Sequence, residues 1–187
     1  MFAWRIQRSA ESYATAQLIA AATNNVTTAA NTGATYADWV SFVSELDPAY
    51  ASSSDSCILV SRNSLKAMRL LEDDQHRPLI SADNYTVTTT TNASQSHGTE
   101  ERTYRVPSIL GLPALTSRYI NDFSAGGGVF ALVGAWSKAY VLRFVSAEVV
   151  VLHERFADYG QVGATGLARF DGLPAMQAAY ATMTAHA

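Results

Sequence analysis

The stretch that decides the fold is Cys57-Ile58-Leu59-Val60-Ser61-Arg62-Asn63, continuing through residues 64–74. Its first four residues form a short apolar run, which is typical of a buried strand. Asn63 is a fitting N-cap for a following helix, whose apolar stripe is made of Leu65, Met68, Leu70 and Leu71. The stretch therefore predicts a strand that leads directly into a helix.

On the N-terminal side, the sequence predicts a helix over residues 36–46. Thr35 can cap it, and Asp38 stands at the position of a capping-box partner. Its apolar face consists of Tyr36, Trp39, Val40, Val43 and Leu46. Asp47-Pro48 ends this helix, because the residue before a proline is pushed out of the helical region. Residues 1–35 are weakly determined, with a short helix at about residues 12–21.

On the C-terminal side, Thr, Tyr and Val enrichment at residues 85–91 and 103–106 predicts an exposed hairpin or flap. Residues 107–113 form a rigid turn into a short strand, and the Gly-rich loop 124–128 precedes a strand at 129–133. Residues 141–144, 148–153 and 159–170 read as half-buried antiparallel strands. The segment 175–184 favours a helix.

The composition excludes several classes of protein. The chain has 187 residues, of which 48% are hydrophobic and 16% charged, with a formal net charge of -3. This content suits one folded domain with a genuine core, and no apolar run approaches the roughly 20 residues of a membrane span. Because positive charge is scattered, no basic stripe exists to neutralise phosphates, and nucleic-acid binding is not expected.

No group of residues emerges as a catalytic, cofactor-binding or metal-binding site. Cys57 cannot form an internal disulfide and reads as a buried small hydrophobe. No G-x-S-x-G elbow occurs, and no Lys-Ser or Lys-Thr follows the glycines at 126–128. The acidic run 72–76, which ends in His76, occupies consecutive positions that do not converge on one ion.

Several motifs in order carry a resemblance to a known family. They are Cys57 to Asn63, Leu70 to Asp74, Arg77-Pro78-Leu79, Leu110-Gly111-Leu112-Pro113, Val133 to Tyr140, Phe156 to Gly163 and Ala168 to Gly172. In this order the chain resembles the tailed-phage major capsid proteins over about residues 35–187, as their C-terminal portion. Each motif alone is common, and the specificity comes from their succession.

The resemblance implies an α+β capsid-type fold of the Hong Kong ninety-seven kind: an axial lobe with an antiparallel sheet flanked by helices, plus part of a peripheral lobe. Residues 1–35 would end the peripheral-lobe region, and residues 36–152 would form the axial lobe. Residues 153–172 would be a long strand shared with the peripheral lobe, and residues 173–187 would return to the axial lobe. The family's N-terminal arm, extended hairpin and long spine helix are expected to be absent from this chain.

The implied function is that of a structural subunit of an icosahedral phage or prophage capsid, which acts by self-assembly and is not an enzyme. The implied partners are other copies of the subunit, arranged in hexamers and pentamers. Neither direct sequence-specific nucleic-acid binding nor membrane binding is expected. The expected locations are the virion capsid and, during assembly, the bacterial host cytoplasm. Candidate subunit contacts are Arg77, Arg118, Arg155, Arg169 and Asp171.

Two alternatives stay open. The first is an encapsulin-like shell subunit that encloses a cargo enzyme. The second is a small α+β enzyme that uses His153 with Glu154, or the acidic group around His76. Cargo co-purification would distinguish the first alternative, and an activity screen of substituted proteins the second.

Overall fold

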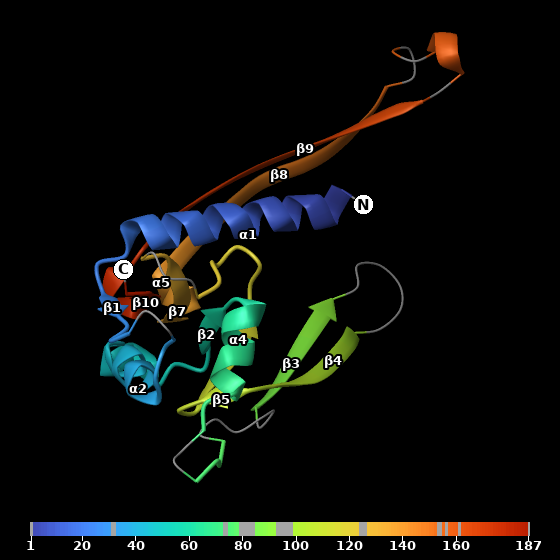
Figure 1. The fold of residues 1–187 in the computed structure, drawn as a ribbon. Helices are drawn as coiled ribbons and strands as arrows, with labels where there is room; N and C mark the ends of the chain where they lie inside the picture. The colour runs from blue at the N-terminus through green and yellow to red at the C-terminus, as the bar shows by residue number, and fades with distance from the viewer. Residues whose placement is uncertain are drawn as a thin grey trace.

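The computed structural model describes residues 2–30, 33–72, 75–78, 85–92, 99–123, 127–152, 155, 157–160 and 162–186. A six-stranded sheet with helices packed on it forms the body, and a long two-stranded ribbon projects from that body (Figure 1). A shorter two-stranded hairpin projects separately. Within the described ranges, no helix combines the length and hydropathy needed to cross a membrane. The predicted α+β class is confirmed.

The sheet has the strand order β1-β10-β7-β2-β6-β5. These strands are β1 (Asn25–Thr27), β2 (Ser56–Val60), β5 (Ser108–Ile109), β6 (Leu112–Thr116), β7 (Val129–Ala135) and β10 (Tyr180–Thr184). Parallel pairs β1–β10 and β2–β6 combine with three antiparallel pairs, so the sheet is mixed. The strands predicted at 57–61 and 129–133 are confirmed as the neighbours β2 and β7 near its centre.

The prediction of a helix over residues 175–184 is wrong. This segment holds a short 3-10 turn, η2 (Gln177–Ala179), and then β10. β10 is buried between β1 and β7, with Tyr180 and Met183 fully covered by the body. Its alanine content favours a helix locally, but strand pairing on both sides outweighs that weak preference.

Helix α2 (Tyr36–Ser44) begins as the sequence predicts. Thr35 and Asp38 form a complete capping box, and the Asp38 carboxylate also accepts hydrogen bonds from the backbone of Ala29 and Thr35. The buried face differs from the predicted one, because Phe42 is fully buried while Val40 is exposed. After Asp47-Pro48 the chain forms a second short helix, α3 (Pro48–Ala51).

Helix α4 (Arg62–Arg69) follows β2, as the opening stretch predicts. Its N-cap is Ser61 and not Asn63, since the Ser61 hydroxyl accepts a hydrogen bond from the backbone N–H of Ser64. Met68 is the fully covered apolar residue of this helix. The helix therefore starts two residues earlier than its polar pattern suggests.

The core lies between the sheet and α2, where aromatic rings meet edge to face. The ring of Trp39 lies 5.9 Å from that of Phe42 and 6.1 Å from that of Phe130, which in turn lies 4.9 Å from Phe123. A neighbouring cluster joins Leu18 of the N-terminal helix to Leu132 and Tyr180 of the sheet. The helix and the sheet are thus one packed unit at this end.

The N-terminal helix is longer than expected. In place of a short helix near residues 12–21, the structure has α1 (Phe2–Ala21), 20 residues long. It runs alongside the base of the ribbon (Figure 1). The prediction for this segment therefore had the right type of element and too short a length.

Two strand pairs stand apart from the sheet. The hairpin predicted near residues 85–106 is confirmed as β3 (Tyr85–Asn92) and β4 (Thr99–Val106). The ribbon consists of β8 (Tyr140–Leu152), which follows the one-turn helix α5 (Trp136–Ala139), and β9 (Gly163–Pro174). A 3-10 turn, η1 (Ala157–Tyr159), lies at the ribbon tip. The two strands predicted at 141–153 are one continuous strand, and Tyr159 belongs to the tip.

Candidate subunit-contact surface

The strand register gives the ribbon two chemically different faces. Residues directly opposite each other in an antiparallel pair share a face, and alternate residues lie on opposite faces. Phe144 lies opposite Phe170, and a register shift after Phe144 keeps the apolar residues of both strands aligned beyond it. We define the apolar face as Leu142, Phe144, Val149 and Val151 of β8 with Ala164, Gly166, Ala168 and Phe170 of β9.

The opposite face carries the charges of the ribbon. Arg143 lies directly opposite Asp171, and Ser146 lies opposite Arg169. Glu148 lies on this face as well, two residues beyond Ser146 toward the tip. This face also carries exposed apolar side chains, namely Val141, Val150, Leu167 and Leu173, so it is mixed, whereas the apolar face bears no charge.

The apolar face is uncovered along most of its length. Leu142 is 48% exposed, Phe144 51%, Val149 58% and Val151 50%. Contiguous apolar surface of this kind marks a contact with another protein surface, because water disfavours its exposure. A two-stranded ribbon without a partner layer is also only marginally stable in water. The face is therefore the strongest candidate for a contact surface in the described chain.

Helix α1 covers the ribbon only near the body. The ring of Tyr13 meets Phe170 edge to face at 6.1 Å, and its hydroxyl donates a 3.1 Å hydrogen bond to the Asp171 carboxylate. That hydrogen bond raises the pKa of the Tyr13 phenol above its ordinary value. The contact anchors the root of the ribbon and leaves its outer part without a covering helix.

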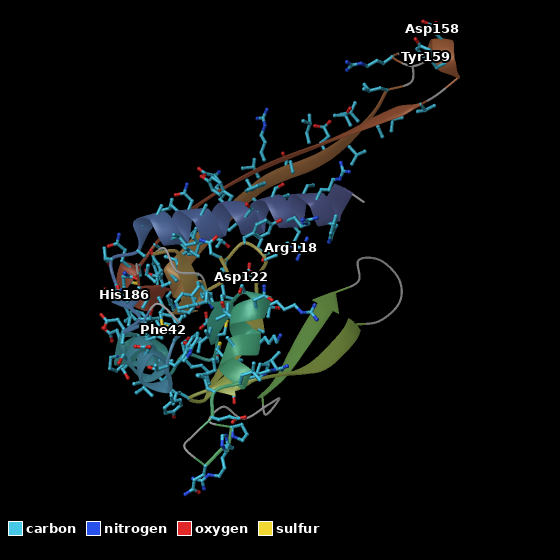
Figure 2. All side chains as sticks on the ribbon, in the orientation of Figure 1. Phe42, Arg118, Asp122, Asp158, Tyr159 and His186 are labelled. Atoms are coloured by element: carbon cyan, nitrogen blue, oxygen red, sulfur yellow. The ribbon has the colours of Figure 1, made fainter. Side chains whose placement is uncertain are left out.

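A polar cavity of about 590 Å³ lies between the N-terminal half of α1 and the body. It is lined by residues of α1, of the start of α4 and of residues 116–122: Trp4, Arg8, Glu11, Ser61, Arg62, Thr116, Ser117, Arg118, Ile120 and Asp122. Figure 2 shows Arg118 and Asp122 beneath α1, with Asp158 and Tyr159 at the distant ribbon tip. We call it the α1 cavity.

The five predicted contact residues do not form one cluster. Arg169 and Asp171 share the charged face of the ribbon, and Arg155 is exposed near its tip. Arg118 lines the α1 cavity, while Arg77 is exposed beyond α4, beside the bridge between Glu72 and Pro78. All five are exposed, but they lie in four separate places on the chain.

Cys57 is built into the core as expected. It is buried, and that burial raises the pKa of its thiol to about 11. The indole N–H of Trp136 donates a 2.9 Å hydrogen bond to its Sγ. A thiol with this pKa is scarcely ionised near neutral pH and is a poor nucleophile.

The other residues considered for chemistry do not converge in the described part of the chain. His76 Nδ1 lies 3.1 Å from the Glu72 carboxylate on an exposed stretch, while Asp73 and Asp74 lie outside the described residues. His153, Glu154 and the loop residues 124–126 lie outside them too. Among described residues, no group of three or more His, Cys, Asp or Glu side chains is arranged to hold a metal ion.

The apolar face was not predicted from the sequence, although the alternating pattern that indicates it is present in β8 and β9. The alternation of apolar and polar residues in β8 and β9 correctly predicted antiparallel strands. Combined with the observed register, it puts Phe144, Val149 and Phe170 on one face. Exposure could not be read from that alternation, because it depends on what packs against the ribbon. The strands were expected to be half-buried, and the outer part of the ribbon is exposed.

Solved structures share this fold. The capsid of an empty GTA particle matches with 17% identity and a TM-score of 0.64, over 87% of this chain and 50% of that one. The capsid of a native GTA particle matches with 19% identity and a TM-score of 0.64, over 87% and 49%. A Gordonia phage Cozz chain matches with 16% identity and a TM-score of 0.54, over 90% and 51%.

The chain thus spans about half the length of the first solved chains it matches. No curated protein matches it significantly. The encapsulin-like alternative and the small enzyme are not favoured by the match to a family profile. The profile of the phage capsid family matches residues 11–185, which is nearly the whole sequence, and the chain therefore belongs to the phage capsid family.

Proposed function

We propose that this chain is the structural subunit, or a large part of it, of a phage-type shell that forms by self-assembly. The observation that carries the proposal is the uncovered apolar face of the ribbon, where Phe144 and Val149 are more than half exposed. Burying such a face against protein is favourable at about 25 cal/mol per Å² of apolar area. A shell of repeated subunits supplies that burial at every copy.

The finer features of the proposal follow from family membership. Its partners would be further copies of the subunit, arranged as hexamers and pentamers of an icosahedral shell. Its locations would be the virion capsid and, during assembly, the host cytoplasm. Neither sequence-specific nucleic-acid binding nor membrane association is part of the proposed function.

The division into lobes is part of the same proposal. Residues 36–152 and 173–187 would form the axial lobe, and residues 153–172 would continue into the peripheral lobe. In the structure the sheet and α2 form one packed unit, while the ribbon already begins at Tyr140. Residues 140–152 therefore pair with the predicted peripheral strand.

The five predicted residues are proposed as contacts of different kinds. Arg169 and Asp171 would act at the root of the ribbon, where Asp171 is already bonded to Tyr13. Arg155 would act at the tip, and Arg77 and Arg118 at the body. Because each is an exposed charge, each contributes little alone, and the apolar face supplies most of the contact energy.

Membership in the phage capsid family indicates a structural protein. We propose that the chain has no catalytic role, which agrees with the high pKa of the Cys57 thiol.

Self-association is the experiment that tests the proposed function. Light scattering and electron microscopy of the purified chain over a range of concentrations should show multi-subunit assemblies that grow with concentration. A product that stays monomeric at every concentration would contradict the proposal.

A further inference from the structure

The walls of the α1 cavity hold an excess of positive charge. Three arginines line it from three elements: Arg8 from α1, Arg62 from the start of α4, and Arg118 from the loop after β6. The carboxylates among its lining residues are Glu11 and Asp122. An acidic group that entered this cavity would therefore meet a surplus of guanidinium groups.

Both carboxylates already accept hydrogen bonds from neutral donors. Glu11 accepts one from the Ser117 hydroxyl at 2.6 Å, and Asp122 accepts one from the Asn63 amide at 2.7 Å. Hydrogen bonds from Ser61 and Asn63 lower the pKa of Asp122, so this group stays ionised. Neither of these two hydrogen bonds comes from an arginine of the cavity.

The arginines differ in how far they are engaged. The Nε of Arg8 donates to the Tyr119 hydroxyl at 3.2 Å, and its guanidinium lies 4.5 Å from the centre of the Trp4 ring. Across the described residues, Arg62 and Arg118 have no hydrogen-bond or ion-pair partner. Trp4 is itself 57% exposed at the rim. The cavity thus offers free guanidinium donors beside an exposed aromatic ring.

The ribbon tip carries a carboxylate and an aromatic ring that suit this cavity, beside the exposed cation Arg155. Asp158 and Tyr159 lie together in η1, and the Tyr159 side chain is 79% exposed. A carboxylate suits the guanidinium groups, and a tyrosine ring suits the side chains of Trp4 and Arg8. The cavity volume of about 590 Å³ leaves room for both side chains.

The tip lies far from the α1 cavity of its own chain. β8 has 13 residues, and at about 3.3 Å per residue it extends about 40 Å from the body. Figure 2 shows Asp158 and Tyr159 well away from Arg118 and Asp122. The contact would therefore join the tip of one subunit to the base of the next.

We propose that the Asp158–Tyr159 tip of one subunit docks in the α1 cavity of a second copy, with Arg62 and Arg118 binding the Asp158 carboxylate. The inference rests on the proposed function and adds to it a defined pair of contact sites. The two sites are different surfaces, so the contact is heterologous and repeats from subunit to subunit, as a shell requires.

Cysteine crosslinking between two single variants tests this contact. One protein carries Val162→Cys beside the tip, and the other carries Thr116→Cys in the cavity or, as a control, Arg69→Cys at the far end of α4. These substitutions leave the proposed binding residues in place. The native Cys57 is buried and does not interfere. The two proteins are mixed and treated with a short bismaleimide, and thermal melts confirm that each variant is folded.

We expect Thr116→Cys to give about tenfold more heterodimer than Arg69→Cys, because docking raises the local concentration of the two thiols. Adding Asp158→Asn to the Val162→Cys protein should lower that yield about two- to fivefold, as for one exposed ion pair. Equal yields for Thr116→Cys and Arg69→Cys would overturn the proposal.

The same mixtures separate this inference from the proposed function. If assemblies form but the two yields are equal, the tip docks elsewhere and only this inference fails. If the protein stays monomeric and the yields are equal, both fail. If the yields are equal and a single-stranded oligonucleotide protects Thr116→Cys from maleimide, a nucleic-acid phosphate and not the ribbon tip occupies the cavity.

Discussion

Phe144 of β8 lies directly opposite Phe170 of β9. Phe170 is held by Tyr13 of α1, while Phe144 is 51% exposed. At this level of the ribbon α1 therefore contacts the β9 side of the apolar face and leaves the β8 side open. The proposed contact surface includes Phe144 and its neighbour on the same face, Leu142, which is 48% exposed.

Two adjacent valines test whether the apolar face makes contacts. Val149 lies on the apolar face, and Val150 lies on the charged face of the same strand. We expect Val149→Asp to change the free energy of unfolding by no more than about 0.5 kcal/mol, because the site is exposed, and to abolish assembly. Light scattering and chemical denaturation measure the two effects.

The matched control is Val150→Asp, which places the same charge one residue away on the other face. It should leave assembly close to that of the unsubstituted protein. Equal loss of assembly in both variants would show that charge anywhere on the ribbon is disruptive, contrary to a contact confined to one face.

Gly134 is required by the packing of β7 against β10. A Cβ at this position would lie 2.7 Å from the Cβ of Tyr180 and 2.9 Å from the carbonyl oxygen of Ala179. Because one of these neighbours is backbone, Gly134→Ala should reduce the free energy of unfolding by about 1–3 kcal/mol. Gly33→Ala is the control, since a Cβ there meets no atom within 4 Å. Denaturant melts that show the same stability for both variants would argue against this packing.

Asp55 makes part of the stability dependent on pH. Hydrogen bonds from Ser137, the largest cause, and from Ser53 lower its pKa from 3.8 to about 2. A carboxyl whose pKa is lower in the folded state contributes stability that is complete above pH 3.8 and is lost as the pH falls through about 2.

Asp55→Asn should therefore reduce the free energy of unfolding by about 0.5–1 kcal/mol near neutral pH, a value discounted for partial exposure. The difference from the unsubstituted protein should shrink toward pH 2. Urea melts at several pH values measure it, and Asp158→Asn at the exposed tip serves as the control. A difference that stays constant down to pH 2 would rule out this role for Asp55.

Cys57 should be almost inert to thiol reagents in the folded protein. Burial raises its pKa from 9.0 to about 11, so its thiolate fraction at pH 8 is about 100-fold lower than in an unperturbed thiol. Reaction with a chromogenic disulfide should be at least that much slower in buffer than in denaturant. Comparable rates in both conditions would show that Cys57 is accessible.

The sequence predicted best where local chemistry decides the structure. The Thr35–Asp38 capping box, the Asp47-Pro48 boundary and the apolar run into β2 each act over a few residues, and each is found as predicted. The position of the α4 cap was wrong by two residues because Ser61 and Asn63 are both good caps. The Ser61 hydroxyl is the one that reaches the backbone N–H of Ser64.

Prediction failed where distant segments decide. Tyr180 to Thr184 contain helix-forming alanine, but pairing with β1 and β7 makes them a strand. The length of α1 was underestimated because its stability comes partly from packing against the sheet and ribbon, as at Leu18 and Tyr13. Four of the proposed contact residues are arginines that were chosen for their charge. The apolar face could not be identified in that way, because its definition requires the register between β8 and β9.

The central claim is that the apolar face of the ribbon is covered by protein in the assembled shell. Electron cryo-microscopy of assembled particles tests this claim most directly, through the surroundings of Leu142, Phe144, Val149 and Val151. We expect all four side chains to be buried against protein in the particle. A particle in which these four side chains still face solvent would contradict the account.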